Sequence, residues 1–135
     1  MQLNPLKTLY QPWEYEKPLN HNAKKIVDWL QSHDDVQQVL YPGFGGMVSV
    51  YLRATLDQTC TVVKSTKVFT LAESLGGVES LIELPALMTH ASVPSDVRAG
   101  LGIDDGLIRL SVGIEHVDDL IEDLSQAIEK GLHNN

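Results

Sequence analysis

The residue best suited to bind a small charged ligand is Arg109, which lies in a stretch of alternating apolar and polar residues. From Leu107 to Ile114 the apolar residues fall on one side of an expected strand, and Arg109, Ser111 and Gly113 fall on the other. The planar guanidinium can grip a carboxylate through two parallel hydrogen bonds. The alternative is an arginine exposed on an open sheet face, which is the commoner situation. The residues alone leave both interpretations open.

A second candidate is the stretch from Phe69 to Leu81, which places small residues, two glycines and polar side chains between apolar segments. A loop of this composition can present backbone N–H groups to an anion. The same composition is typical of a tight turn in which glycine adopts a positive φ, and composition alone favours this second interpretation.

Other kinds of site find little support in the sequence. Cys60 is the single cysteine, which excludes an internal disulfide and a multi-cysteine metal site. The run Gly-Phe-Gly-Gly at 43–46 lacks the lysine and the following helix of a phosphate-binding loop. Lys67 precedes an apolar segment and is interpreted as its solvent-exposed edge rather than as a cofactor lysine. The histidines show no metal-ligand spacing; they are His21, His33, His90, His116 and His133.

Composition narrows the partners and the compartment. The formal net charge is -8 and the ten lysines and arginines are scattered, so nucleic acid is not expected as a partner. No apolar run approaches the roughly 20 residues that span a bilayer, so a membrane is not expected either. The first residues contain three prolines and acidic side chains, unlike a signal or transit peptide. Together with the single cysteine, this indicates a cytoplasmic protein.

The elements that must position these residues can be inferred from periodicity and caps. Asn20, Asp57 and Gly131 are predicted to begin the first helix, begin the second helix and end the last helix, respectively. Residues 72–92 show no clear period and are predicted to form a structured, irregular loop. The helices are expected at Asn20–His33, Asp57–Lys64, Pro94–Leu101 and His116–Lys130, and the strands at Val36–Tyr41, Met47–Leu52, Lys67–Leu71 and Leu107–Ile114. This order predicts an α+β fold in which helices cover one face of an antiparallel-rich sheet.

The order of several motifs resembles one enzyme family over nearly the whole chain. These motifs are Phe69 to Leu81, Pro85-Ala86, Met88 to Ser92, Leu101-Gly102-Ile103 and Gly106 to Glu115. The sequence resembles the C-terminal domain of the Cys/Met-metabolism pyridoxal-phosphate enzymes, which include cystathionine γ-lyase, cystathionine γ-synthase, cystathionine β-lyase and methionine γ-lyase. The resemblance implies the small C-terminal domain of a fold-type I pyridoxal-phosphate enzyme. It divides the chain into an N-terminal arm or inter-domain segment, 1–19, and the small domain, 20–135.

The resemblance also implies roles for particular residues. Arg109 matches the arginine that binds the amino-acid α-carboxylate, and Ser74 matches a serine that helps to position that carboxylate and the cofactor lysine. Thr89 matches a threonine beside the active site. Glu73 matches a position that tunes which sulfur substrate is preferred, and its surroundings look more like the γ-lyase and γ-synthase branch than the β-lyase branch.

The resemblance further implies what this chain lacks. In the family the cofactor, pyridoxal phosphate, is held by a lysine in the large N-terminal domain, and none of the motifs of that domain occurs here. The expected function is therefore substrate recognition in a trans-sulfuration enzyme that makes or breaks carbon–sulfur bonds, with no activity from this chain alone. The family also places a longer segment between two motifs that are fused here as Tyr41-Pro42-Gly43-Phe44-Gly45-Gly46, a deletion expected to leave the sheet intact.

Two other functions are compatible with the same sequence. One is a stand-alone ligand-binding or oligomerisation module without catalysis, and the other is a stable folded remnant without activity. The expected partners are a sulfur amino acid, a second copy of the chain and a partner chain that carries the large domain. Self-association is expected because the sheet face that carries Arg109 and Ser111 would otherwise be bare, as would the N-terminal Leu6, Leu9, Tyr10 and Trp13.

Overall fold

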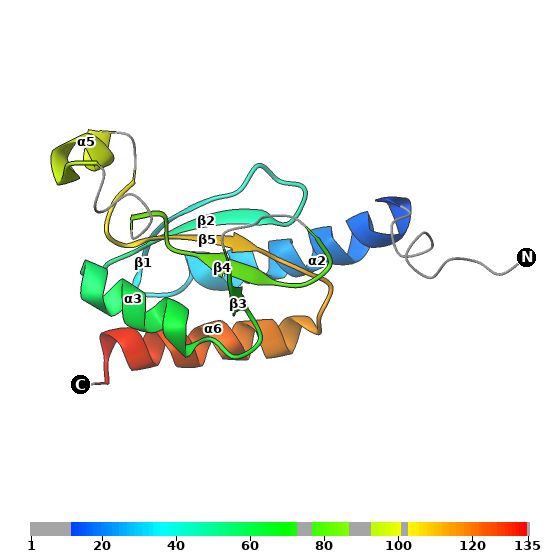
Figure 1. The fold of residues 1–135 in the computed structure, drawn as a ribbon. Coiled ribbons are helices and arrows are strands. Elements are labelled where there is room, and N and C mark those ends of the chain that lie inside the picture. The colour runs from blue at the N-terminus through cyan, green and yellow to red at the C-terminus, as the bar shows by residue number, and fades with distance from the viewer. Residues whose placement is uncertain (1–11, 73–76, 87–92, 101–102, 135) are drawn as a thin grey trace, which may run out of the picture.

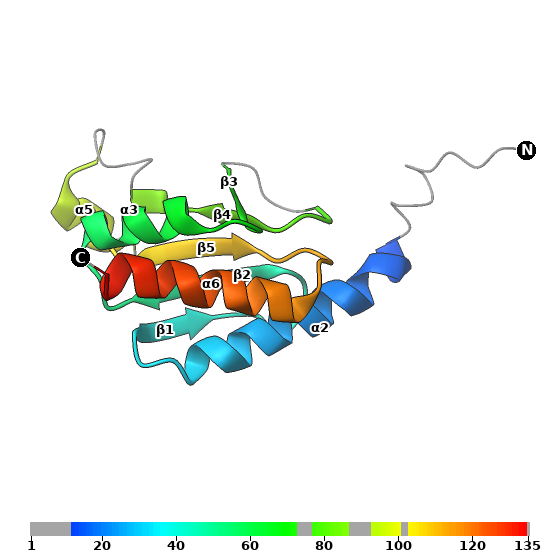
Figure 2. The same cartoon turned by 90° about the horizontal axis from the view of Figure 1, so that it is seen from below.

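The protein folds as one five-stranded sheet with a layer of helices on one face (Figure 1). The computed structural model describes residues 12–72, 77–86, 93–100 and 103–134. The described elements are α2 (Pro12–Gln31), β1 (Val36–Leu40), β2 (Met47–Leu52), α3 (Leu56–Ser65), β3 (Thr70–Leu71), β4 (Leu81–Glu83), α5 (Ser95–Gly100), β5 (Leu107–Ser111) and α6 (Val117–Leu132). Seen from below, α6 crosses the sheet between α2 and α3, and α5 lies beyond the end of the sheet (Figure 2).

The sheet has the strand order β1-β2-β5-β4-β3. β1 with β2, β2 with β5, and β5 with β4 are antiparallel, and only β3 pairs with β4 in parallel. The predicted α+β class, with an antiparallel-rich sheet covered on one face by helices, is confirmed. The fused turn at 41–46 leaves the sheet intact, as expected, because the Tyr41 hydroxyl donates to the Gly45 carbonyl at 2.8 Å and Gly43 and Gly45 adopt positive φ.

One strand was missed by the sequence analysis. Residues 72–92 were predicted to be a loop, but β4 lies within them and all three of its residues are buried. A three-residue strand buried on both faces shows no alternation of apolar and polar residues, so periodicity cannot detect it. The predicted strand at Lys67–Leu71 is reduced to Thr70–Leu71, since the N–H groups of residues 67–69 bind a side chain instead.

Two predicted helix starts were wrong. α2 begins eight residues before Asn20 and continues through Pro18, which lacks only the single N–H that would bond to the carbonyl of Glu14. Asn20 does not cap this helix, because its side-chain oxygen accepts the N–H of Gly45 at 2.5 Å. α3 begins at Leu56, before Asp57, and its N-cap is Thr55. The Thr55 hydroxyl accepts from the Gln58 N–H while the Gln58 side chain accepts from the Thr55 N–H.

The predicted end of the last helix was also wrong. Gly131 lies inside α6 rather than after it, and the helix ends at Leu132 with His133 as its C-cap. A Cβ added at Gly131 would overlap Cγ2 of Val62 and lie 2.8 Å from the carbonyl oxygen of Gln58. Glycine is therefore needed here for the close approach of α6 to α3 and not for a positive φ.

The hydrophobic core lies between the sheet and the three long helices. Val48, Val50 and Leu52 of β2 and Ile108 and Leu110 of β5 point into it. The helices contribute Ala23, Ile26, Leu30, Val62, Val63, Leu120, Leu124, Ala127 and Ile128. Because alternate strand residues face opposite sides, this fixes which residues of β2 and β5 lie on the face without helices. Among the described helices, none has the length and apolar character to cross a bilayer.

Candidate functional site

Arg109 lies on the sheet face opposite the helices, as the alternation of β5 predicts. It sits between Ser49 of β2 and Glu83 of β4, each its direct partner in the antiparallel register. Residues directly opposite each other in antiparallel strands share a face, so Ser49, Arg109 and Glu83 form a row across three strands. The Arg109 side chain is half-buried, and no hydrogen bond or ion pair joins its guanidinium to another residue in the described ranges.

Glu83 is a polar residue of this face that sequence reasoning missed. Its side chain is 6% exposed, and its Oε2 atom is buried without a hydrogen-bond partner. A charged side chain inside an otherwise apolar run, Leu81 to Leu84, was the signal that could have identified it. Buried carboxylates normally have hydrogen-bond or charge partners, so an unpaired one beside an arginine marks a candidate binding position.

The other residues implied by the family resemblance lie outside the described residues. These are Glu73, Ser74 and Thr89, and the structure therefore neither brings them to Arg109 nor separates them from it. Gly77, which lies in the glycine-containing stretch from Phe69 to Leu81, has a φ of 144°. A positive φ is the conformation that favours glycine, so the turn interpretation is confirmed at this position, and anion binding by the loop stays a prediction.

A partly buried carboxylate, that of Glu115, holds the chain shortly after residues 73–76. Glu115 Oε2 accepts the N–H of Ser80 at 2.9 Å and Oε1 accepts the Ser80 hydroxyl at 2.7 Å, while Ser80 Oγ accepts the N–H of Gly113 at 2.8 Å. Asn22 of α2 donates to the carbonyls of Gly113 and Glu115 at 3.0 and 2.6 Å. The network joins α2, the end of β5 and the entry to β4.

A second carboxylate holds the chain just before the same segment. Asp123 of α6 is 4% exposed and accepts three backbone N–H groups. Its Oδ1 accepts from Lys67 at 2.7 Å, and its Oδ2 accepts from Val68 at 2.8 Å and Phe69 at 2.9 Å. Residues 67–69 lead directly into β3. We call Asp123 and Glu115, with the N–H groups they bind, the two stem anchors.

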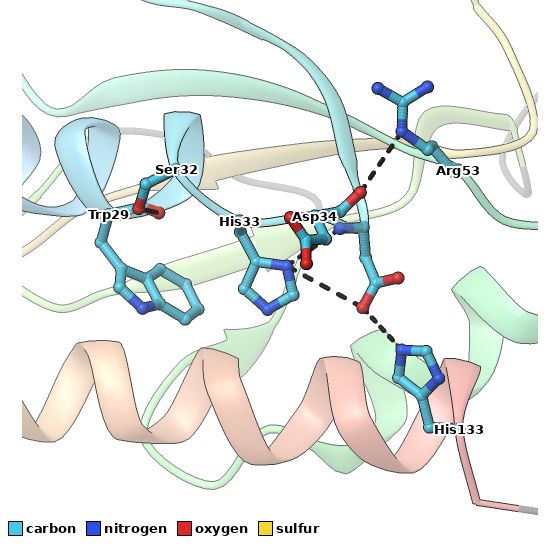
Figure 3. Close-up of polar contacts among 7 residues, drawn as sticks. Trp29, Ser32, His33, Asp34, Arg53 and His133 are labelled. Atoms are coloured by element: carbon cyan, nitrogen blue, oxygen red, sulfur yellow. Dashed lines mark hydrogen bonds and ion pairs between the residues drawn. The ribbon is translucent and has the colours of Figure 1, made fainter.

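A separate polar cluster contains residues of the turn before β1 and His133, which follows α6 (Figure 3). Oδ2 of Asp35 lies 2.7 Å from Nε2 of His133 and 3.9 Å from Nδ1 of His33. The hydrogen bond to Asp35 and its negative charge raise the pKa of His133 above its usual value. Within the described ranges, no group of three or more histidine, cysteine, aspartate or glutamate side chains could hold a metal ion. This cluster ties the end of α6 to the turn before β1.

Comparison with known proteins places these features in a family. The profile described as "Cys/Met metabolism PLP-dependent enzyme" matches residues 6–129. The chain belongs to this family. It is 47% identical over 144 residues to a cystathionine gamma-lyase of Dictyostelium discoideum, covering 95% of this chain and 36% of that protein. It is 50% identical over 123 residues to a cystathionine beta-lyase of Coxiella burnetii, covering 79% and 32%.

A solved structure agrees with the sequence comparison. The crystal structure of cystathionine gamma-lyase from yeast superposes with a TM-score of 0.80 and 38% identity, covering 87% of this chain and 35% of that one. The Cys/Met-metabolism chain described here therefore spans about a third of the length of the relatives it matches. The resemblance inferred from the motifs is confirmed at the level of family and fold.

The family uses pyridoxal phosphate, and the described residues do not fit that group. Lys67 borders a surface hollow of about 200 Å³ that is also lined by Asp119, Glu122, Asp123 and Gln126. Three carboxylates around one lysine would repel the cofactor phosphate. Lys67 is exposed, as expected from the sequence, but it lies three residues before β3 and is not the edge of a strand. We derive no chemistry through the cofactor in this chain.

Proposed function

We propose that this chain is the substrate-recognition part of a pyridoxal-phosphate-dependent trans-sulfuration enzyme of the cystathionine γ-lyase or γ-synthase type. In this proposal Arg109 binds the α-carboxylate of a sulfur amino acid. The observation that carries the proposal is the position of Arg109 on the helix-free sheet face, with no protein partner for its guanidinium among the described residues. Family membership and the span of about a third of the relatives support it.

The chemistry available to this chain is recognition of charge and shape. An arginine guanidinium is planar and stays protonated, so it binds a carboxylate through two parallel N–H···O bonds. A half-buried setting strengthens these bonds because water competes less for the two groups. When bound in the complete enzyme, pyridoxal phosphate supplies an electron sink for breaking or forming carbon–sulfur bonds. Arg109 would orient the substrate for that step without taking part in it.

Three further residues enter the proposal through the resemblance alone. Ser74 would help to position the substrate carboxylate, Thr89 would lie beside the bound substrate, and Glu73 would influence which sulfur amino acid is preferred. The chain alone would be catalytically inactive, and a partner chain carrying the large domain would supply the cofactor lysine. The single free Cys60 and the metabolic role of the family support a cytoplasmic location.

Carboxylate binding can be tested directly on the purified chain. Titration with cystathionine, followed by NMR of the Arg109 Nε–Hε signal, should shift that signal, and Arg109→Lys should abolish saturable binding. Arg53→Lys is the matched control, because Arg53 is exposed and contacts the backbone carbonyl of Asp34 instead. Binding that survives Arg109→Lys, or is lost equally in the control, would refute the assignment.

The absence of catalysis is tested with the cofactor. Addition of pyridoxal phosphate should give no internal-aldimine absorption band and no elimination from cystathionine. A band with turnover would refute the proposal of an inactive chain, and loss of the band in Lys67→Ala would then identify the lysine.

Self-association remains a proposal of the same kind. The structure corrects one of its premises, because Ser111 is 2% exposed within the chain and is not part of a bare surface. The other premise concerned Leu6, Leu9, Tyr10 and Trp13; the first three lie outside the described residues, and so does the side chain of Trp13. Light scattering at micromolar concentration should give at least a dimer mass, and a monomer mass would refute this part of the proposal.

A further inference from the structure

The unpartnered carboxylate of Glu83 requires a physical explanation. Burying a charged group without hydrogen bonds or an opposite charge costs several kcal/mol, and such groups are rare in folded proteins. Glu83 is 6% exposed and its Oε2 atom has no hydrogen-bond partner. Its backbone is fixed in β4, which pairs with a strand on each side. The side chain therefore has to find its partner on the sheet face where it lies.

The group that can satisfy Glu83 is its direct neighbour in the register. Arg109 lies opposite Glu83 in the antiparallel pair of β5 and β4, on the same face. Side chains in such pairs have Cβ atoms about 4.5 to 5.5 Å apart, which is well within the reach of an arginine. The other neighbour of Arg109 in this row, Ser49, carries no charge. Arg109 is thus the nearest cation available to Glu83 in the register.

The side chains of Arg109 and Glu83 also complement each other, because one supplies hydrogen-bond donors and the other supplies acceptors. A guanidinium has five N–H donors, and a substrate carboxylate uses two of them when it binds in the parallel geometry. The remaining donors need acceptors once the face is covered by substrate and by the rest of the enzyme. A glutamate fixed beside the arginine supplies such acceptors, and it also limits the directions in which the guanidinium can point.

We propose that Glu83 is the positioning residue of Arg109: its carboxylate accepts hydrogen bonds from one edge of the guanidinium and leaves the other edge for a ligand carboxylate. Because Glu83 is held in β4, the pair would form by rotation of the half-buried Arg109 side chain. The pairing is a property of this chain, whereas its role in substrate binding rests on the proposed function.

A double-mutant cycle tests the pairing in the chain itself. Arg109→Met should raise the unfolding equilibrium constant, because it leaves the buried Glu83 charge alone, and Glu83→Gln should remove most of that effect. The expected coupling is about tenfold in the equilibrium constant, as for contacting residues in one polar network. If Arg109→Met does not fold, Arg109→Lys serves instead, since it keeps the charge and removes the fork. Additive effects of the two substitutions would overturn the pairing.

A spectroscopic measurement separates positioning from general stabilisation. The Arg109 Nε–Hε proton should exchange with water more slowly in the native chain than in Glu83→Gln, and Glu83→Asp should restore part of the protection. Glu79→Gln is the matched control, because Glu79 is exposed on the segment that leads into β4. Equal exchange in all four proteins would overturn the proposal. Coupling and protection in a chain that binds no cystathionine would support the pairing and count only against the proposed function.

Discussion

Replacing Asp123 by asparagine should destabilise the protein severely, although the two side chains have nearly the same shape. The carboxylate uses both oxygens to accept the N–H groups of Lys67, Val68 and Phe69. An asparagine keeps one oxygen and replaces the other by an NH₂ group, which cannot accept. Even in the better orientation, with the oxygen on Val68 and Phe69, a donor then faces the Lys67 N–H.

The magnitude follows from the number and kind of bonds lost. Hydrogen bonds to charged groups contribute about 1.5 to 3 kcal/mol each, and a buried donor left unsatisfied costs a further amount of about 1 to 3 kcal/mol. The bonds from the Lys67 N–H and from the Gln126 side chain to Oδ1 are lost, and the two that remain lose their charge, so the expected destabilisation is about 3 to 5 kcal/mol. This is a large fraction of the roughly 5 to 15 kcal/mol typical of a domain.

The assay is urea unfolding at neutral pH, followed by far-UV circular dichroism. With an m-value of about 2 kcal/mol per M, the midpoint should fall by about 1.5 to 2.5 M. Glu122→Gln is the matched control: it removes an exposed carboxylate one residue earlier on α6 and should change stability by less than about 0.5 kcal/mol. A midpoint for Asp123→Asn within the range of this control would refute the reasoning about the stem anchor.

The remaining predictions concern other contacts of the fold. Gly131→Ala should destabilise the protein by about 1 to 3 kcal/mol despite the higher helix propensity of alanine, because the new methyl overlaps α3. Gly100→Ala is the control and should not destabilise the protein, because the space around Gly100 is open. Thermal melts of the two variants test this difference. Asn22→Ala should cost about 1 to 3 kcal/mol by leaving two carbonyls without their donor, and an unchanged urea midpoint would contradict this. Because the pKa of His133 is raised in the folded protein, its contact with Asp35 should stabilise the fold fully below the ordinary histidine pKa and lose this contribution as pH rises through the raised pKa. Melting temperatures measured between pH 5.5 and 8.5 should show this loss, and Asp35→Asn should remove it.

The sequence predicted the elements that rely on local periodicity. The strand at Met47–Leu52 was predicted with its observed bounds, because Val48, Val50 and Leu52 recur at every second position. The placement of Arg109 opposite the core followed from the same rule. Its polar neighbours across the sheet did not, since the register that aligns Arg109 with Glu83 depends on pairing between distant strands.

The errors arose where distant contacts override local signals. Asn20 and Gly131 both resemble helix ends, yet one binds the turn at Gly45 and the other allows two helices to approach closely. The strand at 67–71 was shortened because Asp123, more than fifty residues away, takes the N–H groups that a ladder would use. Each of these partners is identified only when the fold is known.

The two stem anchors bind residues 67–69 and Ser80, on either side of residues 73–76. Asp123 lies in α6 and Glu115 lies two residues before its first turn, so one helix and its approach set where the chain enters and leaves the region of residues 73–76. The anchoring bonds use side chains outside that segment. An exchange of residues 73–76 for those of a related enzyme would therefore leave the hydrogen bonds of both anchors in place.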